Sequence, residues 1–142
     1  AIWYGWPKGR SSTFNGARDE SDVWQCARPR RSENHPTSKP SILIERMVRN
    51  SSAPAAWILD LFSGSGSTLM AAERLGRVFR GFEIDPGYVD VIVRRWMNAT
   101  GKKPRLKRDG QLLEWPEIEA AGFSTAPTAH PETSSDAKGG AA

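Results

Sequence analysis

The chain has 142 residues, with 20 Lys and Arg against 16 Asp and Glu and a formal net charge of +4. This length suits one domain, and the six Trp and five Phe are enough to seed a core. No apolar run is long enough to cross a bilayer and no secretory signal is visible, so we expect a cytoplasmic protein. A single cysteine, Cys26, excludes an internal disulfide, and two distant histidines argue against zinc, so we expect no metal.

Composition divides the chain into three zones. Residues 1–34 carry three Trp among Gly, Ser and Arg, and their pattern predicts short strands at 2–4 and 22–25. Residues 35–118 alternate between helical and strand patterns and form the predicted domain. Residues 119–142 are rich in Ala, Thr, Ser, Pro and Gly without periodicity, which predicts a disordered tail.

The middle zone predicts an α/β fold. A helix is expected from Pro40, placed in its first turn, with Leu43, Ile44, Met47 and Val48 on its apolar face. The short apolar run at 57–61 is typical of a buried parallel strand. The elements expected after it are a helix at 68–75 closed by glycine, a strand at 78–84, a helix at 86–100 and a hairpin at 105–114 around Asp109-Gly110. Strand, helix and strand in this order predict a parallel βαβ unit.

A glycine-bearing turn at 63–67 follows the first strand and admits three classes of ligand. The absence of Lys from 62–68 excludes the G-x-x-x-x-G-K-[ST] loop of nucleoside triphosphates. A dinucleotide fingerprint would need a small residue where Leu69 stands, so this alternative is weak but open. S-adenosylmethionine sites place an acidic residue and glycines after one strand and an acidic residue at the end of the next. The chain offers Asp60, Gly64, Gly66 and Glu83 for these positions.

Three ordered motifs resemble those of the β-type DNA amino-methyltransferases. The sequence DLFSGSGST at 60–68 matches the family pattern D-x-F-x-G-x-G-x-T. HPTSKP at 35–40 matches the element that precedes the glycine motif, and FEIDP at 82–86, followed by Tyr88, matches the element of the second strand. The resemblance extends from about residue 4 to 113. It implies a partial Rossmann-like methyltransferase fold and methyl transfer to the exocyclic amine of adenine (N6) or cytosine (N4).

The resemblance also implies roles for individual residues. Thr37 and Lys39 would hold the methionine end of the cofactor, and the turn at 62–66 would wrap around it. Glu83 would accept hydrogen bonds from the ribose, while Ile84 and Asp85 would line the adenine pocket. The implied cofactor-binding set is Thr37, Lys39, Asp60, Phe62, Ser63, Gly64, Gly66, Thr68, Glu83, Ile84 and Asp85.

The catalytic tetrapeptide of this family, D-P-P-Y, S-P-P-Y or N-P-P-[YFW], does not occur in the chain. It would hold the target amine and stack on the flipped base. Asp85-Pro86-Gly87-Tyr88 imitates it but has the form of a helix start. We therefore assign no catalytic residue and expect a chain that is inactive alone. A missing N-terminal half or a second chain would carry the tetrapeptide on a strand beside 57–61.

Two other functions remain open. One is a non-catalytic DNA-binding or assembly subunit, and the other is a small-molecule methyltransferase, which the HPTSKP element argues against. Cys26 follows Gln rather than the Pro of cytosine-C5 enzymes, so we expect it to have a minor packing role.

Double-stranded DNA is the expected partner. Arg28, Arg30 and Arg31 lie just before the HPTSKP element. The resemblance implies that residues 1–34 are the end of a target-recognition segment, so these arginines are expected to contact the DNA. A second basic stretch admits two interpretations, phosphate contact or a solvated helix end: Arg94, Arg95, Lys102, Lys103, Arg105, Lys107 and Arg108. The target base and the DNA site are not readable from these residues.

Overall fold

The computed structural model describes residues 2–12, 14–21, 23–26 and 39–122. The chain divides into two compact units, one ending at Pro104 and one beginning at Arg105. The expected tail beyond residue 122 lies outside the described residues, and the division at 34 and 118 stays a prediction.

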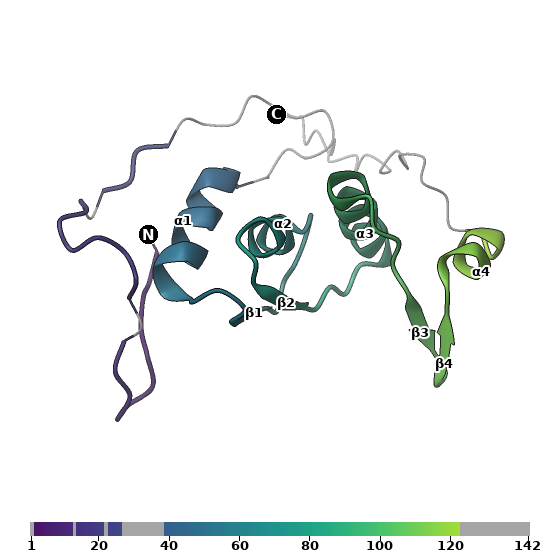
Figure 1. Cartoon of the computed structure of the whole chain (residues 1–142), viewed down its shortest axis with the longest axis horizontal. Coiled ribbons are helices and arrows are strands. Elements are labelled where there is room, and N and C mark those ends of the chain that lie inside the picture. Colours follow the sequence, from purple (N-terminus) through teal and green to yellow (C-terminus); the bar gives the residue numbers. More distant parts are fainter. Residues whose placement is uncertain (1, 13, 22, 27–38, 123–142) are drawn as a thin grey trace, which may run out of the picture. The chain divides into compact units, whose positions relative to one another are not determined.

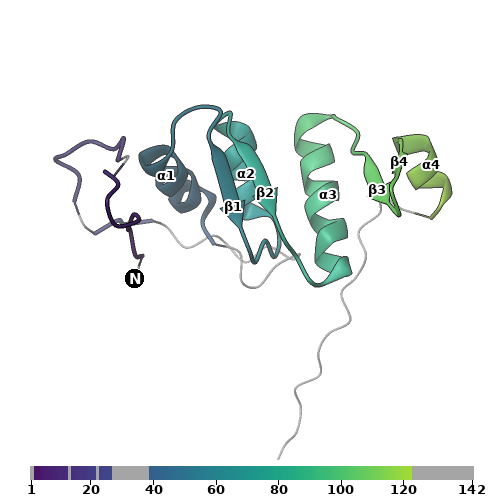
Figure 2. The same ribbon diagram turned by 90° about the horizontal axis from the view of Figure 1, so that it is seen from below.

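The first unit contains a parallel βαβ arrangement, as predicted. Its elements are α1 (Ser41–Ser51), β1 (Trp57–Asp60), α2 (Ser67–Arg74), β2 (Val78–Gly81) and α3 (Pro86–Thr100). β1 and β2 pair in parallel, from Trp57 opposite Val78 to Asp60 opposite Gly81. Figure 2 shows the two strands side by side, with α2 forming the connection between them.

The helix ends follow the local sequence. Gly76 and Gly101 adopt φ values of 67° and 70° just after α2 and α3, because a left-handed residue satisfies the last carbonyls and glycine adopts it without strain. The sequence predicts Pro40 in the first turn of α1. In the structure Pro40 is instead the residue before the helix, with ψ at 124°. β2 also ends earlier than expected, because the backbone N–H of Asp85 turns back to the carboxylate of Glu83.

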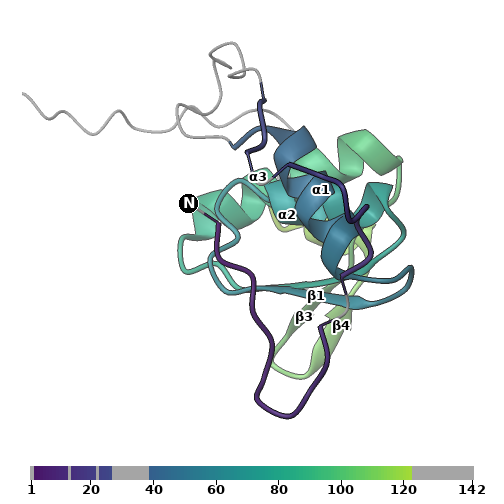
Figure 3. The same cartoon turned by 90° about the vertical axis from the view of Figure 1, so that its left-hand side faces the viewer.

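The core of this unit is small and aliphatic. Ile44 and Val48 of α1 pack against Ala71 of α2, with Ile58 and Leu75 around them. Figures 1 and 3 both show α1 and α2 on one side of the strand pair. Side chains therefore pack against the helices from only one face of β1 and β2.

Most of the described tryptophans lie outside the core. Trp3 and Trp57 are 95% and 72% exposed, and Trp115 alone among the described tryptophans is buried. Trp57 lies on the sheet face that no helix of the described residues covers. Its ring instead stacks with the guanidinium of Arg80, whose Cζ lies 4.9 Å from the ring centroid.

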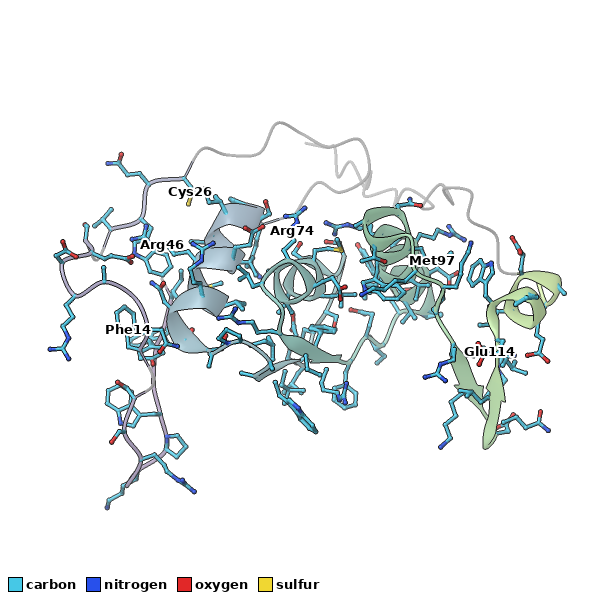
Figure 4. All side chains as sticks on the ribbon, viewed as in Figure 1. Phe14, Cys26, Arg46, Arg74, Met97 and Glu114 are labelled. Atoms are coloured by element: carbon cyan, nitrogen blue, oxygen red, sulfur yellow. The ribbon has the colours of Figure 1, made fainter. Side chains whose placement is uncertain are left out.

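The N-terminal segment forms no strand in its described residues, so the predicted strands at 2–4 and 22–25 are wrong there. Its aromatic rings pack on one another instead of alternating along a pleated strand, with the Tyr4 centroid 5.9 Å from Trp6 and 6.0 Å from Phe14. Cys26 is exposed rather than packed (Figure 4).

Glu20 anchors this segment to α1. Its carboxylate accepts hydrogen bonds from Arg46 Nη2 at 2.7 Å and Asn50 Nδ2 at 3.1 Å, and Arg46 points toward the segment in Figure 4. The ring of Trp24 lies 4.3 Å from the Arg46 guanidinium. The polar face of α1 around Arg46 is therefore partly covered.

The second unit begins with the predicted hairpin. β3 (Leu106–Arg108) and β4 (Gln111–Leu113) pair in antiparallel fashion. Asp109 and Gly110 connect them with φ values of 51° and 82°, which suit the twist of a two-residue hairpin.

A further helix, α4 (Trp115–Ala120), was not predicted. Glu114 and Glu117 form a reciprocal capping box at its start, and Trp115 and Ile118 are its buried residues. The tail expected from residue 119 therefore begins inside a helix. Its sequence signal, Glu114 three residues before Glu117 with Pro116 between them, departs from the usual Ser or Thr cap.

None of the helices in the described ranges is long and apolar enough to cross a membrane.

Candidate functional site

The glycine turn lies where β1 and β2 both end, because parallel strands bring their carboxyl ends to one edge. The N–H of Ser63 donates to the carbonyl of Phe82 at 3.0 Å, and the N–H of Gly66 donates to the carbonyl of Ser63 at 2.8 Å. Gly64 and Gly66 have φ values of 50° and 78°, so both glycines of the motif supply left-handed backbone.

Glu83 joins this turn to the segment after β2. Its Oε2 accepts a hydrogen bond from the N–H of Gly64 at 2.6 Å, and its Oε1 accepts one from the N–H of Asp85 at 3.0 Å. Each carboxylate oxygen can accept a second hydrogen bond. The structure thus brings Glu83 and the glycine turn together, as the motifs predict, and leaves acceptor capacity on the carboxylate.

The residues around this contact form an open, apolar hollow of about 330 Å³. Phe62 and Ile84 are 88% and 98% exposed there, so their side chains are available to a ligand. The residues that line the hollow are Leu61, Phe62, Phe82, Glu83 and Ile84.

Asp60 and Asp85 mainly fix the backbone beside this hollow. Asp60 Oδ1 accepts from the N–H of Phe62 at 3.0 Å. Asp85 is the N-cap of α3 and accepts from the N–H of Gly87 at 2.8 Å, with Pro86 in the first turn. The interpretation of 85–88 as a helix start is therefore correct.

Ser63 is buried under the turn, and its position explains why residue 81 is a glycine. The sequence motifs did not assign a role to Gly81. A Cβ added at Gly81 would lie 2.5 Å from the Ser63 Oγ and 2.4 Å from the ring of Phe79. Gly81 is thus needed for the turn to lie close against β2. The signal in the sequence was a glycine at the end of a strand.

For the remaining predicted residues the structure gives only the exposure of Lys39 and Thr68. Lys39 is exposed just before α1, and Thr68 is half-buried in the first turn of α2. Thr37 and the three arginines of the expected DNA contact, Arg28, Arg30 and Arg31, lie outside the described residues. Their roles stay predictions.

Neither interpretation of the second basic stretch holds for its first two members. Arg94 is buried, with 9% exposure, and half-buried Arg95 donates from Nη1 to the carbonyl of Ser65 in the glycine turn. Burial lowers the pKa of Arg95, and nearby Arg74 lowers it further. Lys102 pairs with Glu73 at 2.7 Å. The contact of Arg95 with the turn was not predicted.

The described part of the chain holds no group of three or more His, Cys, Asp or Glu that could bind a metal ion. This edge of the sheet combines a glycine turn, one carboxylate with acceptor capacity and exposed apolar side chains.

Comparison with known proteins identifies relatives of the chain. A type II methyltransferase of Lactococcus lactis subsp. cremoris, M2.LlaDCHI, is 37% identical over 86 residues, which are 58% of this chain and 32% of the relative. The DNA adenine methyltransferase YhdJ of Escherichia coli (strain K12) is 37% identical over 92 residues, 62% of this chain and 31% of the relative. The chain thus spans about a third of the length of these curated relatives.

A solved structure agrees. The crystal structure of an M1.HpyAVI–SAM complex matches with a TM-score of 0.50 and 29% identity over 60% of this chain and 43% of the other. The fold is therefore part of the α/β fold of the methyltransferases. A family model described as DNA methylase matches residues 6–94, which is more than half of the chain. The chain belongs to this family of DNA methylases.

Proposed function

We propose that the chain is the cofactor-binding portion of a cytoplasmic DNA methyltransferase. It would serve methyl transfer from S-adenosylmethionine to the N6 amine of adenine or the N4 amine of cytosine. The observation that carries the proposal is the contact between Glu83 and Gly64, which makes a carboxylate and a glycine turn one site. Two relatives point the same way: one is named a DNA adenine methyltransferase, and one was solved with SAM.

The residues of the site suit this cofactor. Glu83 retains acceptor capacity for the ribose hydroxyls. Phe62 and Ile84 offer exposed apolar surface for a flat adenine ring. Thr37 and Lys39 are proposed for its methionine end. When bound, the cofactor supplies a methyl group on a positively charged sulfur.

Calorimetric titration with S-adenosylmethionine tests the site. The wild-type chain is expected to bind, and Glu83→Gln to bind about tenfold more weakly, because charge-assisted hydrogen bonds are lost. Glu119→Gln, which makes the same change at an exposed position of α4, is the control. A folded wild-type chain that takes up no cofactor would contradict the proposal.

Catalysis is proposed to need a further polypeptide segment that carries the missing tetrapeptide. In the described residues β1 pairs only with β2, and its bare face exposes Trp57 and Leu59, at 72% and 62%. An added strand beside β1 would pair its free backbone groups. The segment would come from a longer version of the protein or from a second chain.

An assay of tritiated methyl transfer to double-stranded DNA tests this division of labour. The 142-residue chain alone is expected to transfer nothing. A family-length protein that contains it is expected to methylate DNA and to lose most of this activity on Glu83→Gln. Methyl transfer by the chain alone would overturn the requirement for a second segment.

The second candidate function is a non-catalytic DNA-binding or assembly subunit, favoured by the absent tetrapeptide. It predicts DNA binding without cofactor uptake. A gel-shift assay with double-stranded DNA should then show binding that falls when Arg28, Arg30 and Arg31 are all changed to Gln. Cofactor uptake in the calorimeter decides for the first candidate.

A further inference from the structure

We infer that Arg95 is a positioning residue of the glycine turn: it holds the Ser65–Gly66 peptide in the shape that the cofactor site requires. The inference deepens the proposed function and rests on it for the identity of the ligand. Arg95 acts through the turn and is not placed in contact with the cofactor.

The hydrogen bonds hold one peptide unit from both ends. Arg95 Nη1 donates to the carbonyl oxygen of Ser65. The N–H of the same peptide, which belongs to Gly66, donates to the carbonyl of Ser63 at 2.8 Å. The plane of the Ser65–Gly66 peptide is therefore fixed across the turn.

The same face of α3 supports the turn a second time. Ile92 lies three residues before Arg95, so the two side chains project from one side of the helix. A Cβ added at Gly66 would lie 3.0 Å from Ile92 Cγ1, which places Ile92 directly against that glycine. One helix face thus supplies both an apolar contact and a charged donor.

The start of α3 is tied to the same site. Asp85 caps the helix, and its backbone N–H donates to Glu83, whose other oxygen accepts from Gly64. Glu83 therefore holds the turn near Gly64, and Arg95 holds it near Ser65. Glu83 precedes α3 and Arg95 lies after its first two turns, so both contacts depend on how this helix is placed.

The electrostatics favour a dedicated role over incidental packing. Arg95 is half-buried, and no carboxylate of the described residues forms an ion pair with it. Burying a cation without such a partner is costly, and a neutral side chain would pack against the turn at a lower cost. The carbonyl of Ser65 is the group to which Arg95 donates its hydrogen bond.

Three variants of the 142-residue chain test the role. Arg95→Met keeps the length and removes the donors, Arg95→Lys keeps the charge with a single donor group, and exposed Arg108→Met is the control for losing one positive charge. The readouts are the amide NMR signals of Gly64 and Gly66 in the unliganded chain, the calorimetric Kd for S-adenosylmethionine and the thermal midpoint.

Arg95→Met is expected to move the Gly64 and Gly66 signals and to raise the Kd about tenfold, the effect of one hydrogen bond to a charged group. Arg95→Lys is expected to lie between Met and wild type in both readouts, and Arg108→Met to match wild type. A purely structural role would instead lower the thermal midpoint and move signals throughout α3 without restoration of the Kd by Lys.

Each outcome decides one of the two claims. Glycine signals that coincide in Arg95→Met and wild type overturn the positioning role. Glycine signals that move in a chain whose wild type binds no cofactor leave the positioning role standing and overturn the proposed function. If Arg95→Met does not fold, Arg95→Gln, which removes the charge and shortens the side chain, carries the test, and unchanged glycine signals and Kd in that variant overturn the role.

Discussion

Gly66 shows how one residue meets two separate demands. Its φ of 78° is strained for any side chain, and its missing Cβ leaves room for Ile92. Gly76 meets only the first demand, because its φ is 67° but no atom lies within 4 Å of an added Cβ.

These two glycines give a matched pair for measurement. Gly76→Ala is expected to lower the free energy of unfolding by about 1 kcal/mol, the cost of a left-handed residue. Gly66→Ala is expected to cost about 1 kcal/mol more, because Ile92 must also shift. Urea unfolding of both variants checks this, and equal costs would show that the Ile92 contact is energetically neutral.

At this scale the sequence predicted the residues of the motifs but not those that support them. Glu83 and Gly64 could be paired because strand ends in a βαβ unit meet at one edge. The bond from Arg95 to Ser65 spans 30 positions and depends on the rotation of α3 about its axis, which periodicity does not define. Gly81 could not be assigned a role before the turn was seen to lie against it.

The stability of α3 depends on the cap at its N-terminal end. Asp85→Ala removes the side-chain acceptor for the N–H of Gly87 and is expected to lower the free energy of unfolding by about 1 kcal/mol. Asn98→Ala, at an exposed position of the same helix, is expected to change it by less than about 0.5 kcal/mol. Thermal unfolding followed by circular dichroism compares the two; equal losses would count against a capping role.

Glu73 links α2 to the end of α3 and makes stability depend on pH. The side-chain hydrogen bond from Lys102, then that from Trp96, lowers the pKa of Glu73 below its usual 4.5. The folded state therefore binds this proton less readily than the unfolded state, so the stabilisation is complete above about pH 4.5 and is lost as the pH falls through the lower folded value. The pair is partly exposed, and its contribution is small.

The measurement is the thermal midpoint of wild type and Glu73→Gln between pH 3 and 7. Wild type is expected to be slightly more stable at pH 6 to 7, and the difference to shrink below pH 4.5. A difference that grows on acidification would reverse the assigned direction of the pKa.

Elements with strong periodicity and clear end signals were predictable. α1, α2 and α3 lie within a few residues of their expected bounds, and the Asp109-Gly110 turn specified its hairpin. The N-terminal strands failed because Tyr4 packs on neighbouring rings and Trp24 on the guanidinium of Arg46. α4 was missed because its cap is a glutamate. Short elements depend on partners that local sequence does not identify.

At the scale of the whole molecule, the main feature is a two-stranded sheet covered on one face in the described residues. The exposed face is apolar at Trp57 and Leu59, and the outer edge of β1 has no strand beside it there. Both features favour association.

We therefore expect the isolated chain to self-associate with rising concentration. The double change Trp57→Gln and Leu59→Gln should reduce association in analytical ultracentrifugation while leaving the thermal midpoint nearly unchanged. Ile58→Gln, in the same strand but packed on the core, should instead cost about 2 kcal/mol or more of stability. If the double change does not affect association, the surface that mediates it lies elsewhere.

The sequence predicted the α/β class and the family at this scale, but not the location of the hydrophobic surface. The number of tryptophans does not say which of them are buried, because position in the fold decides that. Trp57 belongs to an apolar run that is typical of strands buried on both faces, and only one face of β1 is covered in the described structure.

The bare side of β1 and β2 has a cellular consequence. Chaperones and proteases act on apolar surface that stays uncovered, so the lifetime of this polypeptide in a cell would depend on the supply of whatever shields it. On the proposal that a further segment packs here, the amount of this chain in the cell should rise when that segment is present.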